Sequence, residues 1–505
     1  MRDHLVFYLN GVRRAVRGGQ AAMTLTDYLR DSCTPRLAGT KVACAEGDCG
    51  ACTVLVGKPS ADGDQLQYQT IDACIAFVYQ MDRCHVITVE GLQQAGELTD
   101  VQTAMVECHG SQCGFCTPGF VMALHGLVEC HHNHGADESA TDELSDEEMR
   151  LGLSGNLCRC TGYAQILDAG RSLTPSRVRA DAAYDTTAIL ADLLAVEDGP
   201  VHVNATSHQA ETNGHAEVVS APEVYLPSTL DELLQRRHVR PDSTLVAGAT
   251  DLGVQHNHGK IRPKDILVTS RVPELDVLSY EDDALLIGAA VSWSRVEEYV
   301  EQRIPEYFEI LTRFGSPQVR HAGTLIGNLA NASPIADSIP FHYVAQSTLE
   351  LASTGGRRTV GIEDFYLGYK QLDLRPDEVI VSVRTPLPGA NEKLKLYKIS
   401  KRRDMDISTV TAAFWLEAEA DTIVAARIAT GGVGPTVVRL PKAESALVGQ
   451  PLSESNMREA GQIARDEVTP INDVRGSAAY RLQLVENLFV KCFHDLSSEA
   501  QTVGV

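Results

Sequence analysis

The sequence predicts an α+β protein of several domains, and three observations carry this prediction. The chain has 505 residues, whereas a single hydrophobic core stops growing at roughly 250–300 residues. Twelve of its 13 cysteines lie between Cys33 and Cys160. Strand patterns, helical patterns and one polar stretch then follow one another along the chain. We expect domains over residues 1–90, 91–171, 221–390 and 391–500, with a linker over residues 172–220.

Composition and charge exclude several classes of protein. The chain has 67 acidic and 44 basic residues and a formal net charge of −23, whereas nucleic-acid binding needs a basic patch or stripe. No stretch reaches the roughly 18 apolar residues of a membrane-spanning helix. The apolar run at residues 5–9 is too short for a signal peptide. We therefore expect a cytoplasmic protein that binds neither nucleic acid nor a membrane.

The first 90 residues favour strands around one short helix. Asn10 and Gly11 separate two β-prone runs, and this dipeptide favours a hairpin because both positions tolerate a positive φ. A short helix over residues 20–31 would be capped near Thr24. Further strands are expected at residues 53–56 and 86–89.

The next 80 residues favour helices. Behind Pro118, which suits a first helical turn, apolar residues continue at helical spacing to residue 128. A polar, acidic loop is expected over residues 130–150. Histidines in or near it could suggest a metal site, but a solvated insertion is the better interpretation; they are His125, His131, His132 and His134.

The remaining chain alternates between strands and helices. The linker includes one helix near residues 187–196. A composition break at residues 386–393 separates the last unit. Strands are expected at residues 245–247, 284–289, 349–351, 412–418 and 422–429.

A first set of four cysteines has the spacing of an iron–sulfur site. Cys44, Cys49, Cys52 and the later Cys74 match the C-x₄-C-x₂-C…C pattern of a plant-type [2Fe–2S] cluster. Nearby glycines, Gly47 and Gly50, would let the backbone approach the cluster sulfides, where N–H groups stabilise negative charge. Buried thiols or disulfides are the weaker alternative, because clustered cysteines in a large chain without an export signal favour metal binding.

A second set consists of two short pairs, Cys113 with Cys116 and Cys158 with Cys160. Paired cysteines also bind zinc, so the spacing leaves zinc and an iron–sulfur cluster open. The single residue between Cys158 and Cys160 departs from zinc-ribbon spacing, and the neighbouring first set favours iron–sulfur. The other cysteines match no ligand position and are expected to be buried thiols; they are Cys33, Cys84, Cys108, Cys130 and Cys492.

The second half of the chain has no G-x-G-x-x-G turn, so a Rossmann dinucleotide site is unsupported. Two other glycine-containing loops are expected, at residues 245–252 and 323–337. Small residues there would expose backbone N–H groups to an anion such as a pyrophosphate. Taken singly, each loop is better explained as a tight turn.

Three motifs together resemble the iron–sulfur region of the xanthine dehydrogenase/aldehyde oxidoreductase family. They are KVACAEGDCGACTV at residues 41–54, QCGFCTPG at 112–119 and GNLCRCTGY at 155–163. The two later loops, in this order, resemble the FAD-binding domain of the same family. The resemblance implies a ferredoxin-like β-grasp [2Fe–2S] domain, a helical-bundle [2Fe–2S] domain, an α+β FAD-binding domain and a C-terminal α+β domain.

The resemblance also implies roles for individual residues. Both cysteine sets would ligate clusters, and Gln112 would lie beside a molybdenum cofactor held by a partner. Phe314 would stack near the flavin ring, and Lys398 would pair with a polar edge of it. The implied FAD contacts are Leu245, Val246, Ala247, Gly248, Ala249, Thr250, Asp251, Leu252, Phe314, Thr324, Leu325, Ile326, Gly327, Asn328, Asp337, Ile380 and Lys398.

Four positions depart from the family pattern. Ala45 and Asp48 stand where the family commonly has glycine, which leaves the cysteines intact. Ile326 stands where the family usually has the first glycine of a Gly-Gly-Asn run, so the backbone there is expected to differ. Met405 replaces a residue that is often acidic near the flavin.

The function implied by the resemblance is electron transfer in a molybdenum hydroxylase. Electrons would pass from molybdenum in a partner through two [2Fe–2S] clusters to FAD and then NAD⁺, while hypoxanthine and xanthine are oxidised to urate. The chain stops at Val505, after the flavin segment, which predicts a separate molybdopterin-binding large subunit in a heterotetramer or similar assembly. The alternatives are the same relay for an aldehyde or N-heterocycle hydroxylase, or a non-catalytic cluster-carrier protein, which flavin absorbance would distinguish.

Overall fold

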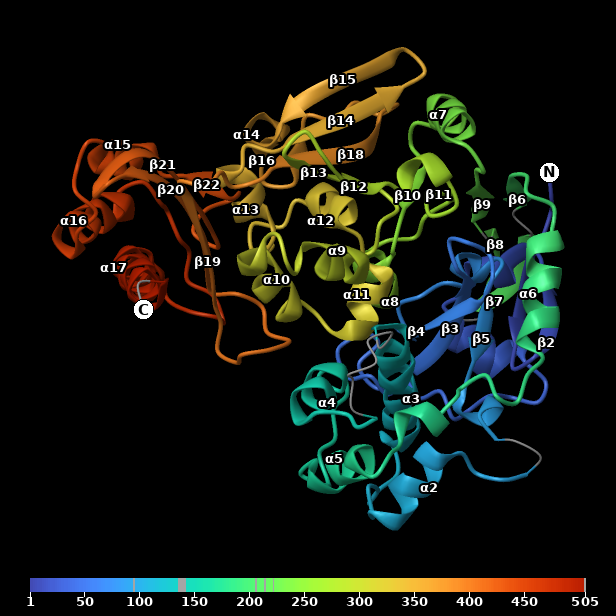
Figure 1. Ribbon diagram of the computed structural model, residues 1–505. Coiled ribbons are helices and arrows are strands. Elements are labelled where there is room, and N and C mark those ends of the chain that lie inside the picture. The colour runs from blue at the N-terminus through green and yellow to red at the C-terminus, as the bar shows by residue number, and fades with distance from the viewer. Residues whose placement is uncertain (94–95, 135–141, 205–206, 213–214, 221, 504–505) are drawn as a thin grey trace. The chain divides into compact units, whose positions relative to one another are not determined.

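The computed structural model in Figure 1 combines sheets and helices along the whole chain, and the predicted α+β multidomain fold is confirmed. The structure describes residues 1–505 apart from 94–95, 135–141, 205–206, 213–214, 221 and 504–505. The chain divides into two compact units, and each is described by itself. Unit 1 comprises residues 1–273 and 316–323, and unit 2 comprises residues 274–315 and 324–505.

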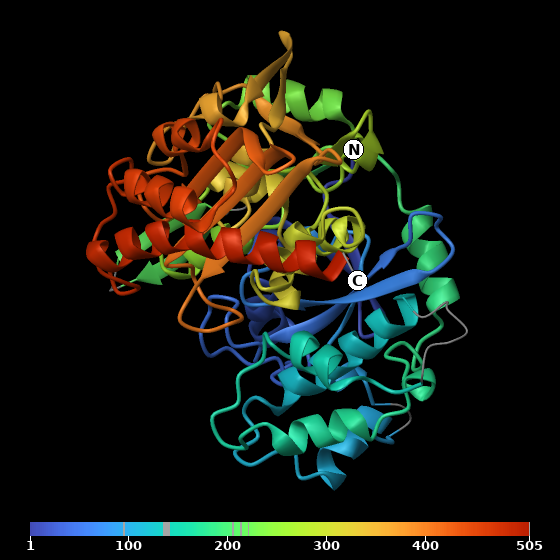
Figure 2. The same ribbon diagram turned by 60° about the vertical axis from the view of Figure 1, so that its left-hand side comes forward.

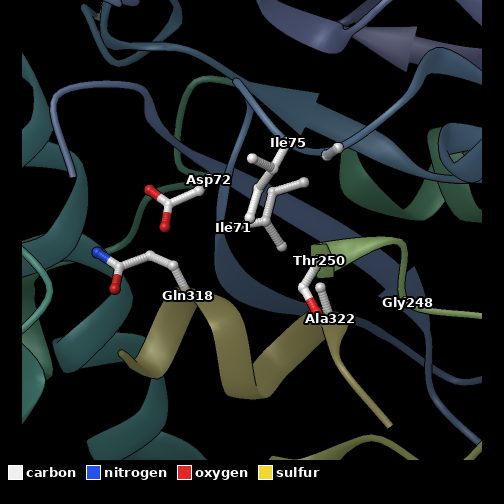
Figure 3. Close-up of a pocket in the computed structure, with 8 residues that line it drawn as sticks. Ile71, Asp72, Ile75, Gly248, Thr250, Gln318 and Ala322 are labelled. Carbon is white, nitrogen blue, oxygen red and sulfur yellow. The ribbon is translucent and has the colours of Figure 1, made fainter. Parts of the chain in front are cut away.

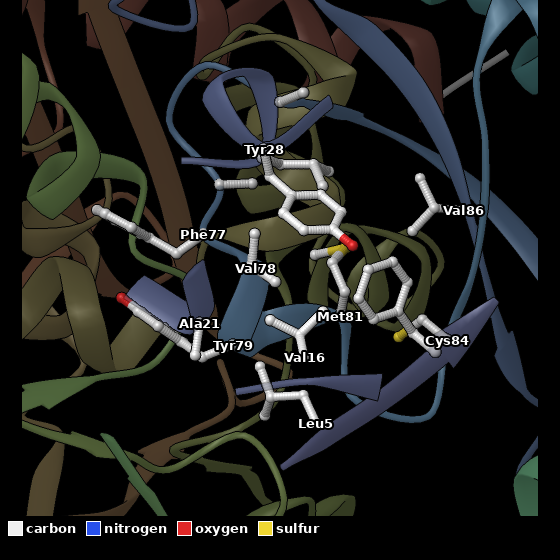
Figure 4. Close-up of a cluster of buried hydrophobic side chains, with 14 of the residues drawn as sticks. Leu5, Val16, Ala21, Tyr28, Phe77, Val78, Tyr79, Met81, Cys84 and Val86 are labelled. Atoms are coloured by element: carbon white, nitrogen blue, oxygen red, sulfur yellow. The ribbon is translucent and has the colours of Figure 1, made fainter. Parts of the chain in front are cut away.

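Unit 1 begins with a mixed five-stranded sheet in the order β2-β1-β5-β3-β4. Its strands are β1 (Leu5–Leu9), β2 (Val12–Val16), β3 (Thr53–Pro59), β4 (Leu66–Asp72) and β5 (His85–Ile87). The predicted hairpin is confirmed, with φ values of 49° at Asn10 and 75° at Gly11. Residue 89, predicted as strand, instead opens a 3₁₀ turn, η4 (Val89–Gly91). Apolar side chains pack on this sheet into the core drawn in Figure 4.

The predicted short helix has a more complex form. A 3₁₀ turn, η1 (Gly18–Ala22), precedes α1 (Leu25–Asp27), which continues as a π-turn, η2 (Tyr28–Ser32). The cap prediction is confirmed, because Thr24 Oγ1 accepts a hydrogen bond from the Asp27 N–H at 3.2 Å. The regular helix therefore starts after the cap rather than at residue 20.

Four helices form the next layer of unit 1: α2 (Asp100–Glu107), α3 (Thr117–His134), α4 (Asp146–Gly152) and α5 (Ala164–Arg171). The loop prediction for residues 130–150 is wrong at both ends, because α3 continues to His134 and α4 begins at Asp146. The two helices are joined by His131 Nδ1 and Glu148 Oε1, 3.2 Å apart. His125 is buried and faces Thr99 Oγ1 at 3.1 Å. Residues 135–141 of the predicted loop lie outside the described residues.

Residues 172–220, which were expected to form a linker, contain helices and strands. They include η5 (Pro175–Arg177), the predicted helix as α6 (Thr186–Ala195), and strands β6 (Val201–Val203), β7 (Ser207–Thr212) and β8 (His215–Ser220). Asp192 of α6 accepts a hydrogen bond from Tyr8 of β1 at 3.1 Å. β6 pairs antiparallel with β9 (Glu223–Leu226). This segment therefore packs on the first sheet and then joins the next one.

The last part of unit 1 is a four-stranded sheet in the order β10-β11-β9-β6. β10 (Thr244–Val246) and β11 (Asp265–Val268) are parallel to each other and β11 to β9. α7 (Leu230–Val239) and α8 (Thr250–Asn257) connect these strands. α11 (Pro317–Ala322) also belongs to unit 1, although it comes much later in the chain.

Two large sheets lie in the described part of unit 2, beside a small two-stranded one. The first has the order β12-β13-β18-β14-β15, with bounds β12 (Leu278–Glu281), β13 (Ala284–Gly288), β14 (Thr348–Ser353), β15 (Gly356–Gly361) and β18 (Val379–Pro386). Its companions are α9 (Trp293–Val300), α10 (Pro305–Thr312), α12 (Leu325–Asn331), α13 (Ile339–Val344), α14 (Ile362–Phe365) and the hairpin of β16 (Tyr366–Gly368) and β17 (Gln371–Leu372).

The second sheet of unit 2 is an antiparallel meander of β19 (Glu392–Ile399), β20 (Val410–Glu419), β21 (Thr422–Gly431) and β22 (Val438–Arg439). Its helices are α15 (Pro441–Leu447), α16 (Glu454–Arg465) and α17 (Ala478–Val503). Figure 2 shows α17 crossing this sheet, and Phe414 of β20 packs edge-on against Phe489 of α17 at 5.0 Å between ring centroids. Among the described helices of the whole chain, none is long and apolar enough to cross a membrane.

Candidate iron–sulfur and flavin sites

The first cysteine set (Cys44, Cys49, Cys52 and Cys74) comes together in unit 1. The Cys44 thiol is hydrogen bonded to the thiols of Cys49 and Cys74, and Cys74 also contacts Cys52. These contacts lower the pKa of Cys44 and raise the pKa of Cys74. The backbone N–H groups of Glu46 and Asp48 donate to Cys44 Sγ at 3.4 and 3.5 Å. Four convergent sulfurs with N–H donors fit an anionic [2Fe–2S] cluster.

Left-handed turns let this loop fold around its sulfurs. The φ values are 73° at Gly47 and 64° at Gly50, and Ala45 has a φ of 58°. Ala45 is therefore a true departure, because a residue with a Cβ occupies a conformation that favours glycine. Asn257, at the end of α8, supports the turn: its Nδ2 donates to the carbonyl oxygens of Ala45 and Cys74, each at 2.8 Å.

The second cysteine set (Cys113, Cys116, Cys158 and Cys160) forms two thiol pairs. Cys113 and Cys160 are exposed, with their Sγ atoms 3.5 Å apart, and the thiols of Cys116 and Cys158 are hydrogen bonded to each other. Burial, followed by this contact, raises the pKa of Cys116 to about 12. Although burial opposes it, hydrogen bonds from the Thr161 hydroxyl and N–H, at 3.1 and 3.4 Å, lower the pKa of Cys158.

The four thiols of the second set come from two segments of the chain. Each thiol pair takes one cysteine from the loop before α3 and one from the segment before α5. Four thiolates arranged in two pairs can bind the two irons of a [2Fe–2S] cluster, and four thiolates also bind zinc, so the zinc alternative stays open at this point.

Exposed apolar side chains accompany the exposed thiols of the second set. Phe115, between two of the cysteines, is 45% exposed and lies under Lys41 Nζ at 5.5 Å from its ring centroid. Leu157 is 49% exposed, and Tyr163 is 36% exposed with its hydroxyl accepting from the Cys158 N–H at 3.0 Å. Gln112 is exposed next to Cys113. This surface (Gln112, Phe115, Leu157 and Tyr163) is called the second-set surface below.

The first predicted flavin segment is the end of a strand, a tight turn and the start of a helix. Leu245 and Val246 belong to β10, and α8 begins at Thr250 after Ala249, which has a φ of 61°. A Cβ at Gly248 would lie 1.9 Å from the Ala322 carbonyl oxygen, so only glycine fits this close approach. The first N–H groups of α8 (Thr250, Asp251 and Leu252) have no partners within the helix and favour an anion. This turn fits a pyrophosphate.

A small cavity in unit 1 lies between this turn and the first cysteine set. Figure 3 shows Asp72 and Gln318 facing each other at one wall and Gly248 and Thr250 at another. Asp72 Oδ1 accepts from the Cys52 thiol at 3.4 Å, and burial raises the pKa of Asp72 to about 7. Asp72 Oδ2 and Gln318 Oε1 are buried acceptors without a hydrogen-bond partner among the described residues. Both side chains were missed from the sequence; the acidic residue two positions before Cys74 was the available signal for Asp72.

The second predicted flavin segment is partly helical, because α12 (Leu325–Asn331) replaces part of the loop expected over residues 323–337. Thr324 caps α12, and its Oγ1 accepts from the Gly327 N–H at 3.0 Å. Ile326 is buried in the first turn of this helix, so the backbone there is compatible with a β-branched residue. Asn328 Oδ1 accepts from the Ser338 hydroxyl at 2.9 Å.

The remaining predicted flavin residues of unit 2 fall in a buried polar region and its apolar neighbours. Lys398 Nζ donates to Asp337 Oδ2 at 2.6 Å and to the Arg313 carbonyl oxygen at 3.1 Å. Two of its three donors are therefore used within the protein. Phe314 packs edge-on against Trp293 at 5.0 Å between ring centroids. Ile380 is buried in β18.

Met405, the fourth departure, lies in a turn. It has a φ of 57°, and Asp406 Oδ2 accepts from the N–H groups of Lys401 and Arg402 at 2.9 and 3.0 Å. The Asp406 carboxylate thus stabilises this turn by accepting hydrogen bonds from backbone N–H groups of the same turn. Nothing in the structure explains why methionine stands at 405.

Three family models match the chain in succession. Residues 88–171 match a "[2Fe-2S] binding domain", residues 218–388 an "FAD binding domain in molybdopterin dehydrogenase", and residues 395–496 a "CO dehydrogenase flavoprotein C-terminal domain". The chain is thus similar, over three successive segments, to a [2Fe–2S] domain, to an FAD-binding domain of molybdopterin dehydrogenases and to a flavoprotein C-terminal domain. It therefore has a [2Fe–2S] binding domain and an FAD-binding domain.

Curated relatives match nearly the whole chain. Xanthine dehydrogenase of Oryza sativa subsp. japonica is 30% identical over 99% of this chain and 40% of its own length. That of Drosophila pseudoobscura pseudoobscura is 31% identical over 100% of this chain and 40% of its own length. The chain thus spans about 40% of the curated relatives it matches.

Solved structures also match part of the chain. Quinoline 2-oxidoreductase from Pseudomonas putida 86 is 28% identical with a TM-score of 0.51, over 55% of this chain and 96% of that one. Carbon monoxide dehydrogenase from Hydrogenophaga pseudoflava, lacking the Mo-pyranopterin moiety of its cofactor, is 26% identical with a TM-score of 0.51, over 53% and 94%.

Proposed function

We propose that this chain is the electron-transfer component of a xanthine dehydrogenase. It would hold two [2Fe–2S] clusters and FAD, and would work with a molybdopterin-binding large subunit in a cytoplasmic heterotetramer or similar assembly. The partner would oxidise hypoxanthine and xanthine to urate, and NAD⁺ would receive the electrons.

The single observation that carries the proposal is the pair of cysteine sets within one folded unit. Both sets belong to unit 1, together with the Gly248 turn that suits a pyrophosphate. A carrier of one cluster would need only one such set. The xanthine dehydrogenases that match nearly the whole chain support the choice of xanthine as the substrate.

The chemistry of the relay belongs to the bound groups: iron–sulfur clusters exchange single electrons, whereas FAD accepts one or two. The chain's own residues supply the environment. Thiolates would hold the irons, and the N–H groups of Glu46, Asp48 and Thr161, which donate to cysteine sulfurs, would stabilise their negative charge. The first-turn N–H groups of α8 would hold the pyrophosphate.

The second-set surface supports a partner at the exposed thiols. Aromatic residues such as Phe115 and Tyr163 dominate binding energy when an interface buries them. A docked large subunit would exclude water from Cys113 and Cys160, which are exposed in the chain alone. Gln112 would then face the partner's molybdenum cofactor.

A second candidate is the same relay for an N-heterocycle hydroxylase. The likeness to quinoline 2-oxidoreductase, which covers 96% of that chain at 28% identity, favours it over an aldehyde hydroxylase. A non-catalytic cluster carrier has less support, because its one hint, Ile326, fits the first turn of α12.

The test is to purify the native complex through this chain and to measure its cofactors and its turnover together. We expect about four iron atoms, one FAD and one molybdenum per chain, with xanthine-dependent reduction of NAD⁺. The same cofactors with turnover of quinoline-type heterocycles but not of xanthine would transfer the proposal to the second candidate. Absence of flavin would overturn both.

A further inference from the structure

The loops of the two cysteine sets touch through their backbones. The Leu157 N–H donates to the Cys49 carbonyl oxygen at 3.0 Å. Cys49 belongs to the first set, and Leu157 immediately precedes Cys158 of the second. One hydrogen bond therefore separates the two ligand segments.

Three buried side chains surround this contact. Asn156 Nδ2 donates to the Gly50 carbonyl oxygen at 3.0 Å and contacts Thr53 Oγ1 at 3.4 Å. Gln318 Nε2 donates to Asn156 Oδ1 at 2.8 Å and to Thr53 Oγ1 at 3.2 Å. The Thr53 hydroxyl donates to the Gly50 carbonyl oxygen at 2.7 Å. We call Thr53, Asn156 and Gln318 the amide junction; their residues are 1–3% exposed.

Glycines make this close approach possible. A Cβ at Gly50 would lie 2.4 Å from Asn156 Nδ2, and a Cβ at Gly155 would lie 2.2 Å from Gln318 Oε1. A Cβ at Gly119, in the first turn of α3, would lie 2.1 Å from the Gly50 carbonyl oxygen. Neither loop has room to shift toward the other without breaking these contacts.

The junction also resists separation of the loops. A buried donor or acceptor that loses its partner costs about 1–3 kcal/mol, and moving the loops apart would break the bonds of Asn156 to both sides at once. The hydrogen bonds fix direction as well as distance, because the Asn156 amide donates to the Gly50 carbonyl oxygen and accepts from Gln318. The junction is thus a rigid spacer between the two cysteine sets.

We propose that Asn156 and Gln318 are positioning residues that fix the separation of the two clusters. This inference rests on the proposed function, because it requires a cluster at each cysteine set. The step they serve is the transfer of one electron from the reduced cluster at the second set to the oxidised cluster at the first, with no bond formed and no proton moved. Gln318 acts through Asn156 and Thr53, and none of the three ligates iron.

The experiment uses the complete complex, fully reduced so that both clusters are paramagnetic. The splitting of their electron paramagnetic resonance lines measures the interaction between the two spins and falls with their separation. Asn156→Leu and Gln318→Leu remove the amides at similar size. We expect both variants to lose part or all of this splitting while keeping wild-type iron content.

Thr53 provides a milder pair of variants in case the leucine variants fail to fold. Thr53→Val removes the hydroxyl that binds both amides while keeping the shape, and Thr53→Ser retains the hydroxyl. We expect loss of splitting in Thr53→Val and its rescue in Thr53→Ser. The matched control is Asn257→Ala, whose amide contacts the first set alone; it is expected to change the line shape of that cluster and to leave the splitting.

Failure of the inference and failure of the proposed function are distinguishable. Zinc at the second set, or a single cluster signal in the wild-type complex, would overturn the proposed function and the inference with it. Two clusters in the wild type, with unchanged splitting in Asn156→Leu, Gln318→Leu and Thr53→Val at full iron content, would overturn the inference alone.

Discussion

The Lys398 ammonium lies 2.6 Å from the Asp337 carboxylate, and their side chains are only 2% and 6% exposed. Asp337 also accepts from the Ser408 hydroxyl through its other oxygen at 2.5 Å. The pair links β19 to the loop between α12 and α13, so it ties the second sheet of unit 2 to the helical flavin segment. Removing one partner of such a buried ion pair lowers the free energy of unfolding strongly, because the remaining charge stays in the interior without a partner.

Lys398→Met is therefore expected to destabilise unit 2 by about 3–5 kcal/mol and to reduce FAD content. The double variant Lys398→Met/Asp337→Leu removes both charges and is expected to recover much of the stability. Urea unfolding followed by tryptophan fluorescence, with flavin absorbance on the purified protein, measures both effects. A single variant as stable as wild type would show that the pair contributes little to the fold.

The cysteine sets give a prediction with internal controls. Cys74→Ser is expected to remove the cluster of the first set and Cys116→Ser that of the second, each lowering iron content by about half and abolishing a different paramagnetic signal. Cys33→Ser and Cys84→Ser are the controls, because these buried cysteines lie outside both sets. A fall in iron with Cys33→Ser equal to that with Cys74→Ser would contradict the ligand assignment.

Much of the site's location followed from the sequence, because ligand spacing is local. The C-x₄-C-x₂-C run brings three thiols to one loop, and Cys74, also predicted as a ligand, reaches them because it lies two residues after the end of β4. Residues such as Asp72, Asn156 and Gln318 were missed for the opposite reason. Their contacts join segments up to 265 residues apart, as between Thr53 and Gln318, and no local pattern predicts such a contact.

The fold errors also have physical causes. Glycine and small residues at 323–328 suggested a loop, yet Thr324 supplies an N-cap and tertiary packing of Leu325 and Ile326 stabilises the helix. The polar end of α3 was assigned to a loop because its histidines are hydrophilic. A helix C-terminus favours such residues through its dipole, and His131 gains a partner in Glu148.

Gly248 gives a prediction for the flavin site alone. Gly248→Ala would force a Cβ against the Ala322 carbonyl oxygen, so the turn before α8 must shift. We expect flavin content to fall while iron content stays at the wild-type level, with a loss of stability of about 1–3 kcal/mol. Gly199→Ala is the matched control, because the nearest atom to its Cβ is a side-chain oxygen at 3.6 Å. Full flavin content in Gly248→Ala would exclude this turn from the flavin site.

Buried neutral histidines make stability depend on pH. Burial lowers the pKa of His85 to about 4 and the pKa values of His125 and His342 to about 3. In the unfolded chain each has a pKa near 6.5, so the unfolded state binds more protons between these values. Their contribution to the free energy of unfolding is complete above about pH 6.5 and is lost as the pH falls toward 3–4.

The thermal midpoint is accordingly expected to fall steadily from pH 6.5 to pH 4 in wild type. His342 bonds within a buried network, with Nδ1 3.1 Å from both Ser347 Oγ and Thr385 Oγ1. His342→Gln keeps a polar group there but cannot be protonated, so its midpoint should be lower at pH 7.5 and fall less steeply below pH 6.5. His238→Gln is the control, because this histidine is exposed at the end of α7. A slope in His342→Gln equal to that of wild type would mean that His342 is protonated in the folded protein at a normal pKa.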